Sequence, residues 1–339
     1  MAEIFLTIFF ISVLLFFLGS GIWVALSMIG VSAIGMMLFT SRPVGDAMAT
    51  TIWGTSSSWT LTALPLFVWM GEILFRTKLS ENLFKGLSPW MQKLPGGLIH
   101  VNVVGCALFA AISGSSAATV ATVGKMSIPE LRKRNYPEKI LLGSLAGSGT
   151  LGLLIPPSII LIIYGVAVQE SIAKLFIAGI FPGIMIALIF MSYVIIWSLL
   201  NKKEMPKILE EYSFWEKVKK SKQLLPVILL ILAVIGSIYT GIATATEAAS
   251  LGVVGALILS FFQKSLNLET FKSSLLGATK TSCMIAFILA GSTFLSLAMG
   301  FTGLPRNLAI WIQNMNLSPY VLILVLMVFY IILGMFLDG

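Results

Sequence analysis

Apolar segments long enough to cross a lipid bilayer recur along the whole chain of 339 residues, and they restrict the fold more than any other feature. About 20 apolar residues cross the hydrocarbon core as a helix. Only 11% of the residues are charged, whereas a soluble domain carries roughly 25%. The longest polar stretch, residues 201–223, is too short to bury a core. The sequence therefore predicts an all-α polytopic membrane protein that lies in a lipid bilayer and has no soluble domain.

The apolar segments also predict the order of the elements along the chain. Two segments that carry charges between apolar residues, 77–94 and 264–280, are typical of amphipathic helices on the membrane surface. Residues 44–60 are expected at the interface, and residues 300–316 are expected to be a connection. The predicted spans are residues 4–18, 22–40, 61–75, 175–200, 224–239, 242–262, 283–299 and 321–337.

Two groups of small and hydroxyl-bearing residues interrupt the apolar sequence. Residues 98–123 are too short to cross twice, so they predict a re-entrant hairpin that turns at Ser113–Ser116. Residues 140–168 predict a crossing that is broken near Gly147–Gly152. A helix can break at membrane depth only where protein or a polar cavity receives the freed backbone groups, and transporters use such breaks to bind solutes and ions. Close helix packing by small residues is the alternative, but it does not explain the hydroxyls.

The positions of Lys and Arg predict the orientation. With the layout above, every Lys and Arg except Arg42, Lys174 and Arg306 falls on one side of the membrane. The positive-inside rule makes that side cytoplasmic and places the N-terminus outside. The net charge of +8 follows from these loops and is explained by the orientation in the membrane, so we expect no nucleic-acid partner.

The order of elements repeats once, which predicts an inverted repeat. Residues 1–200 form the first repeat, with scaffold spans, a surface arm helix, the hairpin 98–123 and the broken helix 140–168. Residues 201–223 form a cytoplasmic loop, and residues 224–339 form the second repeat. Inverted repeats with a binding site near the midplane are a common plan of transporters. The repeat aligns Asp338-Gly339 with the hairpin tip, so we expect the second repeat to be truncated there and the natural chain to be longer.

The two breaks supply the candidate site residues. Free N–H groups at the start of a half-helix favour an anion, whereas carbonyls and hydroxyls at an unwound segment favour sodium. For sodium we predict Ser113, Gly114, Ser115, Gly147, Ser148, Gly149, Thr150 and, through the repeat, Asp338. For the substrate we predict Ser115, Ser116, Thr119, Thr150 and Pro156.

Other polar residues in apolar sequence were assigned separately. Glu247 has two open interpretations, a functional acid inside the membrane or an acid held at a helix N-terminus. Glu72 and Arg76 are spaced for a structural ion pair. Cys106 and Cys283 are expected to be buried reduced thiols. His100 has no metal-ligating neighbour at a suitable spacing, and no metal beyond sodium is expected.

Three motifs in this order resemble one family. The stretches Ser113–Thr119, Gly147–Ser158 and Thr244–Ala249 are similar to the large membrane subunit of TRAP transporters, the tripartite ATP-independent periplasmic carriers. The family usually has Pro where this chain has Ala245, and its members continue past residue 339. The resemblance implies an elevator-type secondary transporter of the bacterial inner membrane, with no cofactor except sodium as coupling ion. It also implies a small four-helix membrane subunit, a periplasmic substrate-binding protein and an organic-anion substrate such as a C4-dicarboxylate or sialic acid.

Sodium-driven uptake of an organic anion is therefore the function that the sequence favours. A stand-alone sodium–carboxylate carrier without a binding protein is the main alternative. An intramembrane hydrolase could use Ser113 or Ser115, but no side chain in the first repeat is placed to activate either serine. A passive channel is a further alternative, and it would carry a flux that is independent of a sodium gradient.

Overall fold

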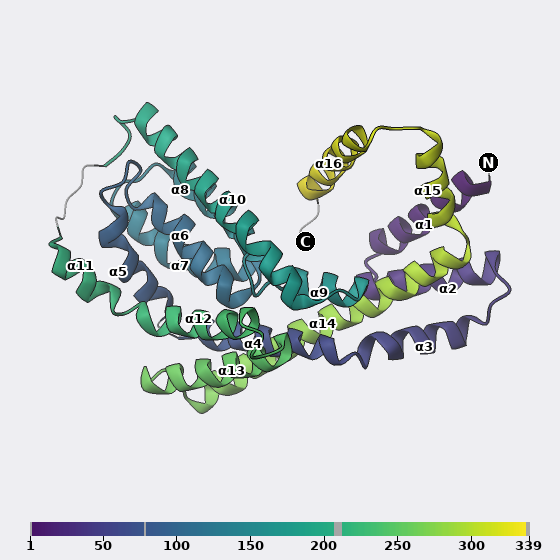
Figure 1. The fold of residues 1–339 in the computed structure, drawn as a ribbon, viewed down its shortest axis with the longest axis horizontal. Helices are drawn as coiled ribbons and strands as arrows, with labels where there is room; N and C mark the ends of the chain where they lie inside the picture. Colours follow the sequence, from purple (N-terminus) through teal and green to yellow (C-terminus); the bar gives the residue numbers. More distant parts are fainter. Residues whose placement is uncertain (1, 78, 207–211, 337–339) are drawn as a thin grey trace. The chain divides into compact units, whose positions relative to one another are not determined.

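The computed structural model describes residues 2–77, 79–206 and 212–336, and all regular secondary structure in these ranges is helical. The chain divides into two compact units (Figure 1). Unit 1 comprises Met1–Ser58 and Cys283–Gly339, and unit 2 comprises Trp59–Ser282. The predicted all-α architecture is thus confirmed for the described residues.

Unit 1 is built from the two ends of the chain. Its small core contains Met36, Phe294 and Ala298, which are all fully buried. Gly291 lets two helices approach closely, because a Cβ there would lie 2.8 Å from the carbonyl oxygen of Ala25. The helices are α1 (Ala2–Gly19), α2 (Val24–Phe39), α3 (Val44–Ser56), the last part of α14 (Leu268–Phe301), α15 (Leu304–Asn314) and α16 (Pro319–Phe336).

Unit 2 holds both predicted breaks. Its helices are η1 (Trp59–Thr62), α4 (Ala63–Phe75), α5 (Leu79–Met91), α6 (Ile99–Ser113), α7 (Ser116–Lys133), α8 (Glu138–Gly149), η2 (Thr150–Leu153), α9 (Ile159–Val168), α10 (Ile172–Leu200), α11 (Phe214–Ser221), α12 (Leu225–Tyr239), α13 (Ala245–Phe262) and the start of α14.

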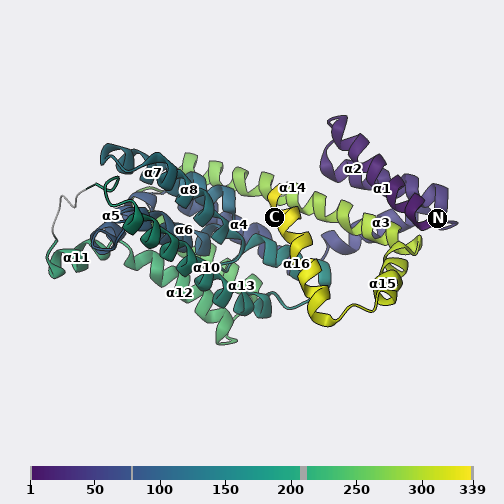
Figure 2. The same cartoon turned by 90° about the horizontal axis from the view of Figure 1, so that it is seen from above.

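Helix α6 is the centre of unit 2. It packs against α4, α5, α7, α8 and α10 (Figure 2). Most of its residues are buried, including Phe109 and Ala110, which have no exposed surface. A helix that is apolar on all sides is expected in such a position, because each face then finds an apolar partner. The hairpin turn at the end of α6 is therefore held from several directions.

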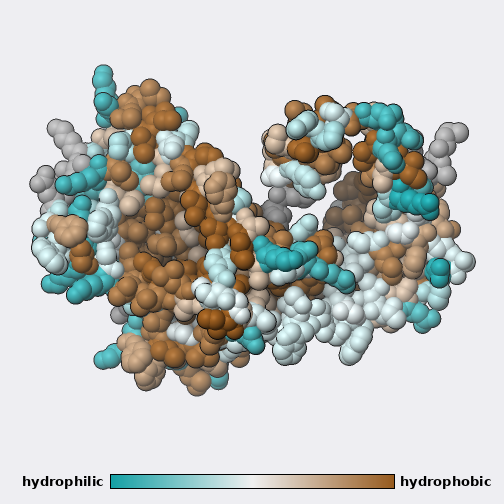
Figure 3. Space-filling model, viewed as in Figure 1, coloured by the Kyte–Doolittle hydropathy of each residue, from teal (hydrophilic) through white to brown (hydrophobic). Residues whose placement is uncertain are grey.

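The surface of unit 2 is strongly apolar along its long helices. In α10, Phe181 is 76% exposed and Leu200 is 80% exposed. Figure 3 shows the same feature as broad brown areas over this part of the molecule. Large contiguous apolar surfaces are uncommon on soluble monomers. Side chains of this kind are suited to contact with lipid.

Three helices of the described residues are long and apolar enough to cross a membrane: α10, α13 and α14. Two bent helix pairs raise the number to five when each pair is counted as one span. The apolar parts of α1, α2, α6, α9 and α16 are shorter.

Several predicted boundaries are wrong. Residues 264–280 and 283–299 are not a surface helix followed by a span, because residues 268–299 all lie in α14, a continuous helix of 34 residues. No proline separates the two segments, so charged side chains on the helix surface do not end it. Likewise α7 continues to Lys133, past the end of the predicted hairpin 98–123, and residues 300–316 contain α15. Cys106 is buried as predicted, but Cys283 is exposed.

Candidate functional site

The first break is a sharp turn between α6 and α7. Helix α6 ends at Ser113, and Gly114 adopts the left-handed conformation with φ 59° and ψ 11°. Glycine is favoured there because a Cβ would be strained in this region. Ser115 is extended and caps α7, and its Oγ accepts a hydrogen bond from the Ala118 N–H at 3.4 Å. The Ser-Gly-Ser sequence thus encodes a helix end, a reversal and a helix start.

Hydroxyl groups stabilise this turn from inside. The Ser113 and Thr119 hydroxyls lie 3.0 Å apart, and Thr119 Oγ1 donates to the Ser115 carbonyl at 2.7 Å. Thr119 is fully buried. These contacts hold Ser113 Oγ beside the backbone of Ser115, with its N–H and its carbonyl each 3.4 Å away.

The second break separates α8 from α9. Helix α8 ends at Gly149, the short helix η2 follows, and α9 starts only at Ile159, after a cis peptide bond between Pro156 and Pro157. Ser158 caps α9, and its buried Oγ donates to the Leu153 carbonyl at 2.6 Å. The break therefore spans an unwound segment, and the Ser158 hydroxyl connects its two ends.

The two breaks are packed backbone against backbone. The Ile159 N–H donates to the Gly114 carbonyl at 3.2 Å. A Cβ on Gly114 would lie 2.5 Å from the Pro157 carbonyl oxygen, and one on Gly152 would lie 2.8 Å from the Ser115 carbonyl oxygen. Neither glycine has room for a side chain, so the predicted hairpin tip and the predicted broken helix form one structural centre.

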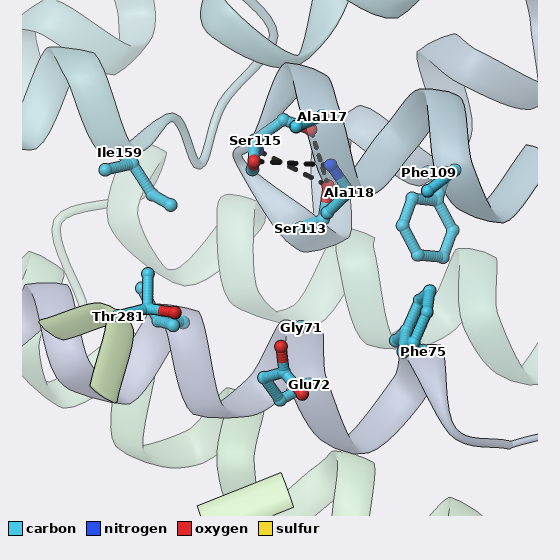
Figure 4. Close-up of a pocket in the computed structure, with 12 residues that line it drawn as sticks. Gly71, Glu72, Phe75, Phe109, Ser113, Ser115, Ala117, Ala118, Ile159 and Thr281 are labelled. Atoms are coloured by element: carbon cyan, nitrogen blue, oxygen red, sulfur yellow. Dashed lines mark hydrogen bonds between the residues drawn. The ribbon is translucent and has the colours of Figure 1, made fainter. Parts of the chain in front are cut away.

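An open pocket of about 320 Å³ borders this centre. Its polar side chains are Glu72, Ser113, Ser115 and Thr281, and the remaining lining is mostly apolar (Figure 4). Ligand sites usually have this composition, a largely apolar wall with a few placed polar groups. Thr281 was not foreseen, since it lies in α14 far along the sequence.

Two helices begin at the pocket. Ala117 and Ala118 from the first turn of α7 line it, and so does Ile159, the first residue of α9. The Ala118 N–H of α7 donates to Ser115 Oγ and the Ile159 N–H of α9 donates to the Gly114 carbonyl. Both ends still carry the partial positive charge of a helix N-terminus, which favours an anionic group. Carbonyl groups from the end of α6 lie at the same turn and favour a small cation.

The one acid in the pocket lining is paired with an arginine. Glu72 Oε2 accepts hydrogen bonds from Arg76 Nη2 at 2.9 Å and from Nε at 3.2 Å. The pair packs closely against α14, because a Cβ on Gly277 would lie 2.7 Å from Glu72 Oε2. The predicted structural ion pair is thus confirmed. Arg76 offsets the negative charge of Glu72 at the pocket.

The hydroxyls of the second break are engaged elsewhere. Ser148 Oγ is buried and donates to the Ser144 carbonyl at 2.6 Å. Thr150 Oγ1 is exposed and donates to the Gly147 carbonyl at 2.7 Å. Neither side chain lines the pocket that Ser113 and Ser115 line. Their role as sodium or substrate ligands stays a prediction.

Other predicted site residues serve packing at the second break. Gly147 faces Phe190, Gly149 faces Val120, and Pro156 is buried. Ser116 lies against Gly152 through its backbone. None of these residues lines the pocket, and Asp338 lies outside the described residues.

Glu247 acts as a helix cap in the structure. Its carboxylate accepts hydrogen bonds from the N–H and the hydroxyl of Thr244, both at 2.8 Å, at the start of α13. Thr244 in turn accepts from the Glu247 N–H at 3.3 Å, which completes a capping box. Glu247 is exposed and does not line the pocket, so its geometry favours the second of the two interpretations.

Asn102 is a buried polar residue that the sequence analysis missed. Its Nδ2 donates to the Leu141 carbonyl at 3.2 Å and to Ser144 Oγ at 3.0 Å. It therefore ties α6 to α8, the two helices that lead to the two breaks. A lone amide in an apolar arm was the available signal, since a buried amide needs partners on a neighbouring helix.

Tyr136 fixes the base of the hairpin. Its hydroxyl accepts a hydrogen bond from the Leu98 N–H at 3.0 Å, directly before α6. Burial raises the pKa of Tyr136, although the Leu98 hydrogen bond acts in the opposite direction. His100, also near this base, places Nε2 2.7 Å from the Pro95 carbonyl oxygen.

Comparison with known proteins identifies the family. Residues 9–339 match the family described as "Tripartite ATP-independent periplasmic transporter, DctM component". The chain belongs to this family. It is a membrane-embedded permease component of a TRAP transporter and not an enzyme, so the hydrolase alternative is wrong.

Relatives support the same assignment. The chain is 34% identical over 307 residues to the "C4-dicarboxylate TRAP transporter large permease protein DctM" of Pseudomonas aeruginosa, which covers 90% of this chain and 71% of the relative. It is 32% identical over 323 residues to the "Sialic acid TRAP transporter large permease protein SiaM" of Vibrio cholerae, and this match covers 94% of this chain and 74% of the relative. It is 30% identical over 330 residues to the "Isethionate TRAP transporter permease protein DctMQ" of Oleidesulfovibrio alaskensis, and this match covers 95% of this chain and 51% of the relative.

Proposed function

We propose that this TRAP permease component imports a small organic anion together with sodium ions. One observation carries the proposal. The hairpin turn and the broken helix meet at one pocket, and helices α7 and α9 both begin there. Two positive helix ends can bind a carboxylate or sulfonate without a buried lysine or arginine. The substrates named for the relatives, a C4-dicarboxylate, sialic acid and isethionate, support the same chemical class.

Sodium would bind at the turn itself. Ser113 Oγ, Ser115 Oγ and the carbonyl of Ser115 lie within one turn of the chain, and they are oxygen ligands of the kind that sodium takes at unwound helices. An ion there would lie beside the anion at the pocket. Each would then lower the electrostatic cost of burying the other, which is a physical basis for coupling their movement.

The working transporter would have further components. We propose that a small four-helix membrane subunit and a periplasmic substrate-binding protein assemble with this chain in the bacterial inner membrane, with the N-terminus on the periplasmic side. The pocket is open and mostly apolar, with few groups that would select one anion over another. Delivery by a binding protein would supply that selection.

Uptake into liposomes tests the proposal. The full chain is reconstituted with its small subunit, and radiolabelled carboxylates and sulfonates are offered with an inward sodium gradient, with a potassium gradient, and with or without candidate binding proteins. We expect uptake only with sodium and a binding protein. Sodium-driven uptake without any binding protein would favour the stand-alone carrier, and flux that is equal in both gradients would favour a channel.

A further inference from the structure

Helix α11 has an unusual surface that the transport function does not explain. Phe214 is 64% exposed and Trp215 is 77% exposed. Lys217, Lys219, Lys220 and Lys222 follow within the same short stretch. Figure 3 shows hydrophilic atoms gathered at the end of unit 2 where Figure 1 places α11. Aromatic and cationic side chains therefore lie close together on and directly after this short helix.

Helix α11 is held in place by α5. Trp90 Nε1 donates to Ser221 Oγ at 2.7 Å, and the Trp90 ring meets Phe214 edge-on at 6.2 Å. Lys217 Nζ lies 5.5 Å from the centroid of the same ring. At the next turn, Leu224 packs against Gly86 of α5. The surface is thus a fixed feature of the fold.

The charge of this surface is positive. Glu216 is the single acid within residues 214–222, and its carboxylate accepts a hydrogen bond from the Ser213 N–H at 2.8 Å in a capping box. Lys220 Nζ lies 3.8 Å from the centroid of the Tyr212 ring. Cation–π contacts leave the charge of a lysine intact and hold it in position. Residues 214–222 thus carry four lysines and a single acid, and that acid is already used to cap the helix.

The bend between α11 and α12 turns α11 toward the membrane surface. The chain bends by 58° between α11 and α12, and α12 is an apolar helix. If α12 enters the bilayer along its normal, this bend turns α11 away from the normal and toward the surface. Tryptophan is enriched at the depth of the lipid headgroups, and lysines there attract anionic lipids.

We propose that α11, together with Trp90, docks on the anionic phospholipid headgroups of the leaflet next to the loop 201–223. Phe214 and Trp215 enter the headgroup region, and the lysines contact lipid phosphates. The choice of lipid over an acidic protein rests on the combination of exposed aromatic rings with lysines and on the bend toward α12. Through Trp90, the docked helix would hold α5 against the membrane.

Hydrogen exchange in nanodiscs tests this surface directly. The full chain is reconstituted in phosphatidylcholine alone or with phosphatidylglycerol, and amide exchange is followed across residues 214–222. A lysine near an anionic surface gains about fivefold in binding, so phosphatidylglycerol should slow exchange there by at least about tenfold. The variant K217Q/K219Q/K220Q should lose this effect. The control K125Q/K133Q/K139Q removes equal charge from exposed lysines of another segment and should keep it.

Three results would overturn the proposal. Exchange could be independent of phosphatidylglycerol in the wild-type protein. Phosphatidylglycerol could slow exchange equally in K217Q/K219Q/K220Q. Soluble polyglutamate, added to phosphatidylcholine nanodiscs, could reproduce the protection while phosphatidylglycerol does not, which would indicate an acidic protein partner.

Discussion

The contact between the two breaks makes Gly114→Ala the most informative single change. Gly114 combines a left-handed backbone with direct contact to the second break. A Cβ there would lie 2.5 Å from the Pro157 carbonyl oxygen and 3.0 Å from the Ile159 nitrogen. Both atoms are backbone atoms, so neither can rotate away. The substitution must either shift α9 or open the turn.

The expected loss of stability has two parts. The left-handed conformation costs an alanine about 1–2 kcal/mol. Moving α9 away breaks the hydrogen bond from the Ile159 N–H to the Gly114 carbonyl, and an unpaired buried group costs about 1–3 kcal/mol. The free energy of unfolding should therefore fall by about 2–5 kcal/mol.

Alanine substitutions at two other glycines distinguish the conformational cost from the cost of displacing α9. Gly21 has φ +78° with nothing within 4 Å, so Gly21→Ala measures the conformational cost alone. Gly143 lies in α8 with nothing within 4 Å and an ordinary φ, so Gly143→Ala should be neutral or stabilise by up to about 1 kcal/mol. Unfolding is followed by titration with SDS in mixed micelles, and sodium-driven uptake is measured in parallel.

The comparison has a clear negative outcome. Gly114→Ala should destabilise the protein by more than Gly21→Ala and should abolish uptake. If the two variants lose the same stability, the hairpin turn does not pack on the broken helix, and the reasoning about a shared centre fails.

Three further predictions concern orientation and local contacts. Single cysteines at Ser221 and Gln169 should label from opposite sides of the membrane, Ser221 from the cytoplasm; labelling of Ser221 from the periplasmic side would contradict the re-entrant hairpin. Tyr136→Phe leaves the Leu98 N–H without its partner and should cost about 1–3 kcal/mol in SDS titration, so an unchanged midpoint would refute this contact. Glu247→Gln weakens the capping box and should lower the midpoint of SDS unfolding slightly without altering the sodium concentration for half-maximal uptake. A large shift in that concentration would return Glu247 to the ion site.

The breaks could be predicted because their residues have strong local effects. Gly114 between two serines specifies a helix end and a new cap, and the Pro156-Pro157 pair cannot continue a helix. These preferences act over a few residues and depend little on the rest of the fold. The hairpin tip and the second break were therefore visible in the sequence.

The partners of the hydroxyls could not be predicted in the same way. Ser148 and Thr150 bond to carbonyls of their own helical turns, whereas Ser113 and Ser115 line the pocket. All four residues look alike in sequence, and the difference depends on which helices surround them. Thr281 lines the pocket only because α14 continues past Lys280, where the charge pattern had suggested a surface helix.

The central claim is that the hairpin turn binds the coupling sodium ion, and a sodium titration of uptake tests it most directly. Ser115→Ala and Ser113→Ala are compared with Ser260→Ala, because Ser260 is a buried serine of α13 whose hydroxyl donates to the Ala256 carbonyl of the same helix. Loss of a ligand or hydrogen bond costs about 1–3 kcal/mol, so the half-saturating sodium concentration should rise roughly 5- to 150-fold in the first two variants. It should not change in Ser260→Ala. An unchanged sodium dependence in alanine variants of Ser113, Ser115, Ser148 and Thr150 would contradict a sodium site at the two breaks.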